Sequence, residues 1–349
     1  MLFTEEPNDA AQVRFQITQD GFKRWSVASF GASASNLKAA YALQLDGNAP
    51  GGSLSSDRAS GSPKMKTTGI NLLPRLLLPI AIMALRPFSS PAPPAVRSDP
   101  AIISTVEEIK ADFAAVPCKD AERLNAVKSL FEKMGAAPSD ITVEKYKNVE
   151  NVIIRKQGAS DDKIVIGAHY DKVSEGCGAI DNWTGIVVLA HLYKTLKPYA
   201  LKKTVLFIAF GKEELGLVGS HAFVAGIKKE ELPRYCSMIN IDSLGLAAPQ
   251  VLDNTSSKKL TDLAAAAAKE MKMPFGHAGI LNADADSSSF LSKKIPALTI
   301  HGLTNDWEKI LHSRNDQPSK VNAASVYLGY RLALVLATRV DESGCGAYR

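Results

Sequence analysis

The sequence predicts an α/β fold, a mostly parallel mixed central sheet flanked by helices on both faces. Its apolar residues form short continuous runs, rich in Val, Ile, Leu and Phe, at 163–168, 204–210, 237–241 and 296–300. Such runs are typical of strands that are buried on both faces. Stretches with helical spacing of apolar residues separate the runs, and this alternation favours a layered fold around parallel strands.

The elements follow one another regularly from about residue 100. Alternating apolar and polar residues at 141–146 and 149–155 indicate two antiparallel strands at a sheet edge. Helical spacing is present at 102–115, 119–135, 183–197, 215–228, 256–272, 287–294 and 320–338. The length of 349 residues and the 46% hydrophobic content suit one large domain with some length to spare.

The first hundred residues differ from the rest. Residues 45–63 are rich in Gly, Ser, Pro and Asp, with too little apolar content for a core. Met65 begins a stretch in which Lys66 and Arg75 precede an apolar run at 76–85, and a polar segment follows. This is the layout of a signal peptide. The run is too short for a permanent membrane span, which needs about 20 residues.

We therefore expect export, to the periplasm or out of the cell, with translation starting at Met65. On this interpretation residues 1–64 are a disordered leader or a mis-assigned start, and residues 65–98 are the signal-like segment and a linker. Residues 99–340 form the main domain, and residues 341–349 are a C-terminal tail. The alternative is a buried apolar segment in the folded N-terminal region of a cytoplasmic protein.

Charge and cysteine usage exclude some classes of protein. The 41 Lys and Arg residues against 36 Asp and Glu give a net charge of +5, without the clusters typical of nucleic-acid binding. The cysteines, Cys118, Cys177, Cys236 and Cys345, form no CxxC pair, which argues against a thiolate zinc site. Both a Cys118–Cys345 disulfide and four free thiols are consistent with the sequence.

Polar side chains follow the predicted strands at the points where the strands end. These residues are His169, Asp171, Glu213, Glu214, Asp242, His301 and, one loop further on, His312. In open α/β sheets ligands bind at the carboxyl ends of the strands, because the loops converge there. The sequence therefore predicts that these imidazoles and carboxylates share one crevice.

This set of side chains predicts a metal site. Three or more carboxylates in one cleft repel one another and need a cation to stay ionised near neutrality. Mixed imidazole and carboxylate ligands suit zinc, whereas calcium and magnesium prefer oxygen alone. Two histidines and three carboxylates from such a crevice would fit two zinc ions about 3.5–4 Å apart that share one carboxylate. One carboxylate of the Glu213–Glu214 pair then remains free as a base.

The motifs around these residues resemble a known family. They are GAHYDKVSEGCGAIDNWTG at 167–185, FGKEELGLVGS at 210–220, INIDSLG at 239–245, ADSSSFLSKKIPAL at 285–298 and HSRNDQP at 312–318. In this order they resemble the di-zinc aminopeptidases that include bacterial leucyl aminopeptidases, with glutamate carboxypeptidase II, transferrin receptor and glutaminyl cyclase as relatives. The resemblance covers about residues 100–340 and implies a zinc exopeptidase fold with residues 99–340 as the catalytic domain.

The resemblance also implies a cofactor, two Zn²⁺ ions per chain bridged by Asp181. His169 and Asp242 would complete one metal site. Glu214 and His312 would complete the other. His301 is the rival to His312 because it ends a buried strand, but the HSRND context favours His312.

Three further roles follow from the resemblance. Glu213 would be the catalytic base that activates a water molecule shared by the two metal ions. Asp171 would orient His169, and Asp316 would play a similar part for His312.

The implied activity is hydrolysis of the N-terminal peptide bond, with peptide or protein N-termini as substrates. From the charge pattern and the short apolar run we expect no nucleic-acid partner and no stable membrane span. A glutaminyl-cyclase-like aminoacyltransferase, a carboxypeptidase and a non-catalytic receptor-like homologue are the alternatives on this fold. The five filled ligand positions favour hydrolysis. Asp286–Ser287 stands where the family often has Asp-His, which puts substrate contacts rather than metal ligands in doubt.

Overall fold

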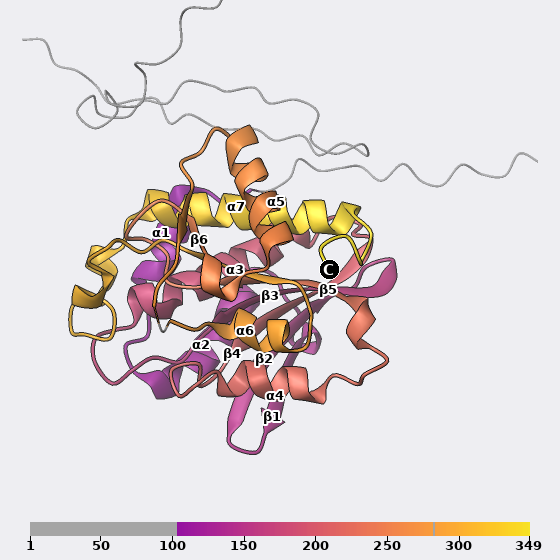
Figure 1. Ribbon diagram of the computed structural model, residues 1–349. Helices are drawn as coiled ribbons and strands as arrows, with labels where there is room; N and C mark the ends of the chain where they lie inside the picture. The colour runs from indigo at the N-terminus through magenta and orange to yellow at the C-terminus, as the bar shows by residue number, and fades with distance from the viewer. Residues whose placement is uncertain (1–102, 282) are drawn as a thin grey trace, which may run out of the picture. The chain divides into compact units, whose positions relative to one another are not determined.

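An eight-stranded mixed sheet forms the centre of the computed structural model, which describes residues 103–281 and 283–349 (Figure 1). These residues belong to the compact unit Ala101–Arg349. The expected leader at 1–64 and the signal-like segment at 65–98 lie outside the described residues. Within the described ranges, no helix combines the length and the apolar content that crossing a membrane requires.

The strands follow the order β1-β2-β4-β3-β5-β8-β6-β7 across the sheet. They are β1 (Ile141–Tyr146), β2 (Val149–Lys156), β3 (Ser160–His169), β4 (Lys203–Phe210), β5 (Tyr235–Ile241), β6 (Gln250–Leu252), β7 (Gly276–Ala278) and β8 (Ala297–His301). The central strands β4, β3, β5 and β8 are parallel. Antiparallel pairs join β1 to β2, β2 to β4 and β6 to β8 near the two edges.

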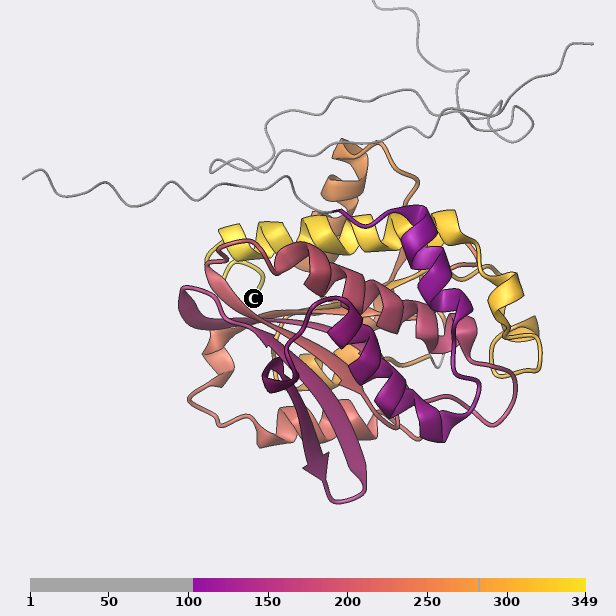
Figure 2. The same ribbon diagram turned by 180° about the vertical axis from the view of Figure 1, so that it is seen from behind.

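Helices cover both faces of this sheet (Figures 1 and 2). They are α1 (Val106–Ala114), α2 (Asp120–Lys133), α3 (Thr184–Leu196), α4 (Val218–Gly226), α5 (Lys258–Glu270), α6 (Asp286–Ser292) and α7 (Ala323–Glu342). The larger apolar core lies between one face and α1, α2, α3, α5 and α7, and a smaller core lies under α4 and α6 on the other face. Helix α3 is apolar on all sides because it packs against the sheet and against α1, α2 and α7.

The predicted fold class is confirmed. All eight residues of β4 are buried, as its continuous apolar run indicates. The two edge strands expected at 141–146 and 149–155 are β1 and β2. The short strands β6 and β7 were not predicted, because three residues are too few to show a period.

Two disulfides are present among the described residues, Cys118–Cys177 and Cys236–Cys345. Neither of the two possibilities that the sequence left open, a Cys118–Cys345 pair or four free thiols, is present. The first disulfide joins the segment before α2 to the loop that precedes α3. Spacing alone could not choose this pairing, because the cysteines become neighbours only through the tertiary fold.

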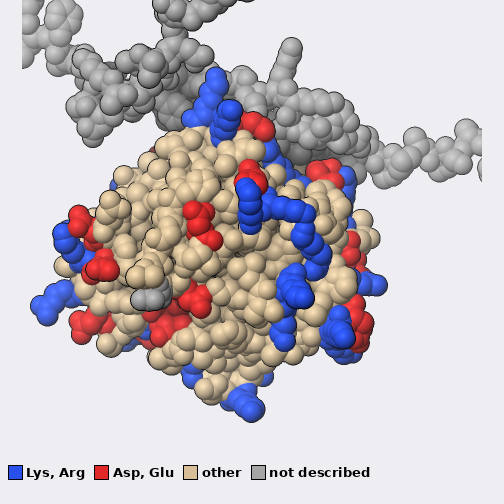
Figure 3. Space-filling model, viewed as in Figure 1, with Lys and Arg blue, Asp and Glu red and all other residues tan. Residues whose placement is uncertain are grey.

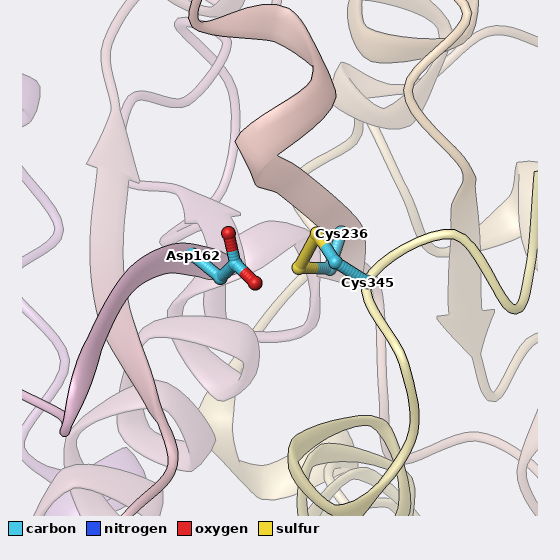
Figure 4. A group of neighbouring side chains, drawn as sticks. All are labelled: Asp162, Cys236 and Cys345. Carbon is cyan, nitrogen blue, oxygen red and sulfur yellow. A yellow bond between two sulfur atoms is a disulfide. The ribbon is translucent and has the colours of Figure 1, made fainter.

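The second disulfide fastens the C-terminal tail to β5, and Figure 4 shows the Asp162 carboxylate beside it. Asp162, Cys236 and Cys345 bring their ligand atoms within 4.8 Å of one another. The two sulfur atoms are bonded to each other and offer no thiolate, so this trio is not a metal site. Arg349 adds hydrogen bonds from its guanidinium to the carbonyl oxygens of Leu232, Tyr235 and Lys294. Residues 343–349 are thus bound to the domain.

Candidate metal centre

The candidate ligands lie where the parallel strands end. His169 is the last residue of β3 and lies level with Phe210, the last residue of β4. Asp242 follows β5, and its backbone N–H donates a hydrogen bond to the carbonyl oxygen of Ile300 in β8 at 2.9 Å. Asp181 lies in the turn Ala179–Trp183 just before α3, and its own backbone angles are not helical. The crevice predicted from the strand ends is therefore present.

Asp181 faces two different histidines. Its Oδ1 lies 3.1 Å from Nε2 of His169, and its Oδ2 lies 3.1 Å from Nε2 of His312. Asp242 Oδ1 lies 3.4 Å from the same His169 nitrogen, and Glu214 Oε2 lies 3.0 Å from the His312 nitrogen. The five side chains therefore form two groups, with Asp181 in both.

These distances fit metal coordination. Donors about 2.0–2.1 Å from a tetrahedral zinc ion lie about 3.3 Å from one another, and the observed spacings are 3.0–3.4 Å. Oε1 of Glu214 is buried without a hydrogen-bond partner among the described residues. Four of the five candidate ligands have side chains at most 14% exposed, His312 is 54% exposed, and this crowded set of nitrogen and oxygen donors suits zinc.

The carboxylates raise the pKa of both histidines. Hydrogen bonds to Asp181 and Glu214 raise the pKa of His312 to about 10. Burial alone would lower the pKa of His169, but the negative charges of Glu213 and Asp242 raise it well above its ordinary value. In the absence of metal, protons on the two imidazoles thus balance the carboxylates. A divalent cation would take over this balancing charge and release the protons.

His312 reaches Asp181 and Glu214 through an unusual backbone conformation. Its φ of 55° lies in the left-handed region, which costs a non-glycine residue about 1–2 kcal/mol. His301, the rival from the sequence, ends β8, and the contacts with Asp181 and Glu214 are made by His312. The structure therefore places His312, and not His301, against the other candidate ligands.

Glu213 and Glu214 are adjacent but differently placed. Glu214 contacts His312, whereas Oε2 of Glu213 lies 4.0 Å from Nε2 of His169. The ligand atom of Glu213 lies within 4.8 Å of those of His169 and Asp242. Burial raises the pKa of Glu213 well above its ordinary value, and nearby Asp242 adds to this effect. Glu213 therefore borders the ligand set and has a raised affinity for a proton.

Asp171 supports the Glu213–Glu214 turn. Its carboxylate accepts hydrogen bonds from the backbone N–H groups of Glu213 at 2.9 Å and Glu214 at 3.2 Å. Its Oδ1 lies 3.6 Å from Nδ1 of His169, which is too long for a hydrogen bond. The contact with His169 expected from the resemblance is therefore loose, and its orienting role stays a prediction.

Asp316 supports Asp181. Its carboxylate accepts hydrogen bonds from the backbone N–H groups of Ile180 at 2.7 Å and Asp181 at 3.1 Å. Burial raises its pKa to about 6. The expected role was to orient His312, but the described contacts hold the backbone of the shared carboxylate instead.

Arg123 is a residue that the sequence did not single out. It is fully buried on α2, and its guanidinium donates hydrogen bonds of 2.6–3.3 Å to the carbonyl oxygens of Pro117, Tyr170, Asp171, Cys177 and Gly178. Burial lowers its pKa to about 10, so it stays charged at neutral pH. Gly178 has a φ of 55°, and a Cβ there would lie 2.9 Å from the guanidinium. Arg123 thus joins the segment after His169 to the segment before Asp181.

A cavity of about 330 Å³ opens onto the candidate ligands. Leu252, Leu303 and Leu311 give it apolar walls, and Asp284 and Glu308 add carboxylates. None of the described residues that line it is Lys or Arg. Figure 3 shows acidic side chains on the left of the view, with Lys and Arg side chains beside them at the outer edge, where Figure 1 places the gold loops after β8.

Comparisons with known proteins agree with this geometry. The model of Peptidase family M28 matches residues 151–336. Aminopeptidase YwaD of Bacillus subtilis (strain 168) is 34% identical over 127 residues, which cover 36% of this chain and 27% of that protein. Leucine aminopeptidase 2 of Trichophyton rubrum is 28% identical over 177 residues, which cover 47% and 36%. The chain thus spans about a quarter to a half of the length of such curated relatives.

Solved structures share the fold. An aminopeptidase from Aneurinibacillus sp. strain AM-1 matches with 26% identity and a TM-score of 0.50, over 56% of this chain and 48% of that chain. A glutaminyl cyclase from an Acidobacteriales bacterium matches with 18% identity and a TM-score of 0.61, over 73% and 100%. The family match covers more than half of the 349 residues and contains every candidate ligand. Together with the predicted crevice at the strand ends, this shows that the chain belongs to Peptidase family M28.

Proposed function

We propose that this chain is a zinc-dependent aminopeptidase that binds two zinc ions and releases the N-terminal residue of peptides. The observation that carries the proposal is the position of Asp181, whose two oxygens each face a different histidine. A carboxylate shared between two groups of ligands suits a pair of metal ions. The names of the similar proteins, which are aminopeptidases, support the activity.

Five side chains would hold the metal ions: His169, Asp181, Glu214, Asp242 and His312. When bound, the zinc ions would polarise the scissile carbonyl and make an attacking water molecule more acidic. Glu213 would take the proton from this water and pass it to the leaving amine. Burial raises the pKa of Glu213, which increases its affinity for the proton that it would accept.

The charges in the cavity favour an N-terminal over a C-terminal substrate. Two divalent ions would balance the four carboxylates of Asp181, Glu213, Glu214 and Asp242 at the centre. Asp284 and Glu308 also line the cavity and add carboxylates beyond these four. A peptide's α-ammonium group matches this remaining charge, whereas a terminal carboxylate needs a cation such as Arg. No Lys or Arg is among the described lining residues.

Zinc analysis and a set of end-blocked peptides test this proposal together. We expect two zinc ions per purified chain and stepwise release of N-terminal residues from a free peptide and from its C-terminally amidated copy. An N-acetylated copy should stay intact. Cleavage of the acetylated but not the amidated peptide would indicate a carboxypeptidase. Conversion of N-terminal Gln to pyroglutamate would indicate a cyclase, and no turnover with zinc bound would indicate a binding protein.

A further inference from the structure

We propose that His301 is a substrate-binding residue, whose Nε2–H donates a hydrogen bond to a backbone carbonyl oxygen of the peptide in the cavity. The proposal rests on the proposed function, because it assigns a role to a residue of the same site. His301 lines the cavity together with the candidate metal ligands but takes no part in the close contacts that join them.

The hydrogen bonds of the imidazole fix which nitrogen carries the proton. Nδ1 of His301 accepts a hydrogen bond from the backbone N–H of Leu303 at 3.3 Å. A nitrogen that accepts must be unprotonated, so in the neutral ring the proton is on Nε2. The ring is only 2% exposed, and burial lowers its pKa to about 4. His301 is therefore a neutral imidazole with an N–H donor on Nε2.

This donor has no acceptor within the described protein. Nε2 is buried and makes no hydrogen bond to any described residue. An unsatisfied buried polar group costs about 1–3 kcal/mol. Asp242 and Asp253 act on the ring through their charges, but neither accepts a hydrogen bond from it. A partner from outside the chain would remove this cost.

The serine and threonine hydroxyls of the cavity are already used. The hydroxyl of Ser243 donates to Oδ1 of Asp242 at 3.1 Å. The hydroxyl of Thr299 lies 2.7 Å from that of Ser287, which itself donates to the carbonyl oxygen of Thr255. Thr299 must therefore donate to Ser287 and has no proton left for a ligand.

A peptide brings an acceptor of the right kind. Its α-ammonium group can be met by the carboxylates of the cavity, but its carbonyl oxygens need donors, and carboxylates cannot donate. The Nε2–H of His301 is a donor that the protein leaves free. A peptide carbonyl is therefore the partner that the chemistry of this cavity indicates.

Variants at His301 test the proposal through substrate turnover. His301→Phe keeps the ring shape without a donor, and His301→Gln keeps an N–H donor. We expect His301→Phe to lower kcat/KM for N-terminal release about tenfold, the size usual for one lost hydrogen bond between protein and substrate. His301→Gln should recover much of this loss. His221→Phe, on the exposed side of α4, should match the wild type.

The zinc content separates substrate binding from a ligand role. It should stay the same in both His301 variants. Unchanged kcat/KM in His301→Phe would overturn the proposal, and so would loss of zinc from both variants or a His301→Gln variant that is as impaired as His301→Phe. If the wild type itself released no residue, the proposed function would fail instead.

A second measurement does not depend on turnover. Long-range ¹H–¹⁵N spectra of the zinc-loaded protein should show His301 as the neutral form with its proton on Nε2. Addition of a phosphinic dipeptide analogue should shift that proton downfield. A ring protonated on Nδ1, or a proton that the analogue leaves unmoved, would contradict the inference even if the enzyme were inactive on the peptides tested.

Discussion

The carboxylate of Asp171 accepts a hydrogen bond from the backbone N–H of Glu213 at 2.9 Å. The two residues follow the neighbouring parallel strands β3 and β4. The segment after β3, which contains Asp171, therefore fixes the turn after β4, which contains the proposed base Glu213. Because the same carboxylate also accepts from Glu214, one side chain positions both members of the pair.

Replacement of Asp171 by Asn should disturb this turn. One carboxylate oxygen becomes an NH₂ group, which cannot accept from a backbone N–H. We expect kcat/KM or zinc affinity to fall about 10–100-fold, as is usual when a group that supports metal ligands is lost. Steady-state kinetics and zinc titration measure the two effects. Asp162→Asn, near the other end of β3, is the control, and equal behaviour of the two variants would rule out this role.

The adjacent glutamates should separate catalysis from metal binding. Glu213→Gln should keep both zinc ions and lower kcat by at least about 10²-fold, because it removes the general base. Glu214→Gln should lose zinc, since it removes a proposed ligand that lies 3.0 Å from His312. Zinc analysis and steady-state kinetics of the two variants measure these effects. Near-normal turnover in Glu213→Gln would show that another group is the base.

The metal-free protein should lose stability as the pH rises. Burial raises the pKa of Asp286 to about 7 and that of Asp316 to about 6, both from ordinary values near 3.8. Their folded states favour the protonated form, so this stabilisation is complete below about pH 4 and is lost as the pH passes through 6–7. The pKa of His312 is raised to about 10, so its contribution is complete below its ordinary value near 6.5 and disappears as the pH rises through 10.

The raised pKa values of Asp286, Asp316 and His312 therefore all lower the stability of the metal-free protein as the pH rises. Between pH 5 and pH 9 we expect the Tm of the metal-free protein to fall by several degrees, at about 2–4 °C for each kcal/mol. Zinc should raise the Tm more at pH 8 than at pH 5, because bound protons no longer compete for the ligands. Differential scanning calorimetry with and without a chelator measures both trends. A metal-free protein that is most stable at pH 9 would contradict them.

Loss of Arg123 should destabilise the domain strongly. Arg123→Met leaves carbonyl oxygens of five residues without their donor, and we expect the free energy of unfolding to fall by about 3 kcal/mol or more. Arg339→Met is the control, since Arg339 pairs with Glu270 near the surface and such pairs contribute at most about 1 kcal/mol. Urea unfolding compares the two. Similar losses in both variants would show that the buried hydrogen bonds are not what matters.

Export is expected from the segment that begins at Met65. Residues 65–100 fused to a reporter that folds only after export should direct its secretion. The two disulfides in the described domain fit an oxidising compartment. A reporter fused to the same segment with the apolar run at 76–85 made polar is the control. Equal retention of both fusions inside the cell would remove the export proposal.

Much of the fold could be predicted because its strands are buried on both faces. The run that became β4 is apolar at nearly every position, and the helices between strands show a clear period. The strand-end rule then brings His169, Glu214 and Asp242 together without any tertiary information. Asp181 needed the family resemblance, because it lies in a turn before α3 and not directly after a strand.

Other parts of the site depend on tertiary contacts that leave little trace in the sequence. Arg123 sits in an amphipathic helix, where an arginine is usually solvated. Asp316 lies four residues after His312, yet it hydrogen-bonds the backbone before α3. The free Nε2–H of His301 follows from its contact with Leu303, which only the turn after β8 creates.

Arg123 and the disulfides also define how much of the chain is needed for a working protein. The family match begins at residue 151 and ends at residue 336. A fragment cut to those limits would lack Arg123, whose hydrogen bonds join the segment after His169 to the segment before Asp181. It would also lack Cys118 and Cys345, one partner of each disulfide. A fragment that keeps Arg123 and both disulfides must therefore include residues 118–345. Expression fragments and domain grafts should use these limits and not those of the family match.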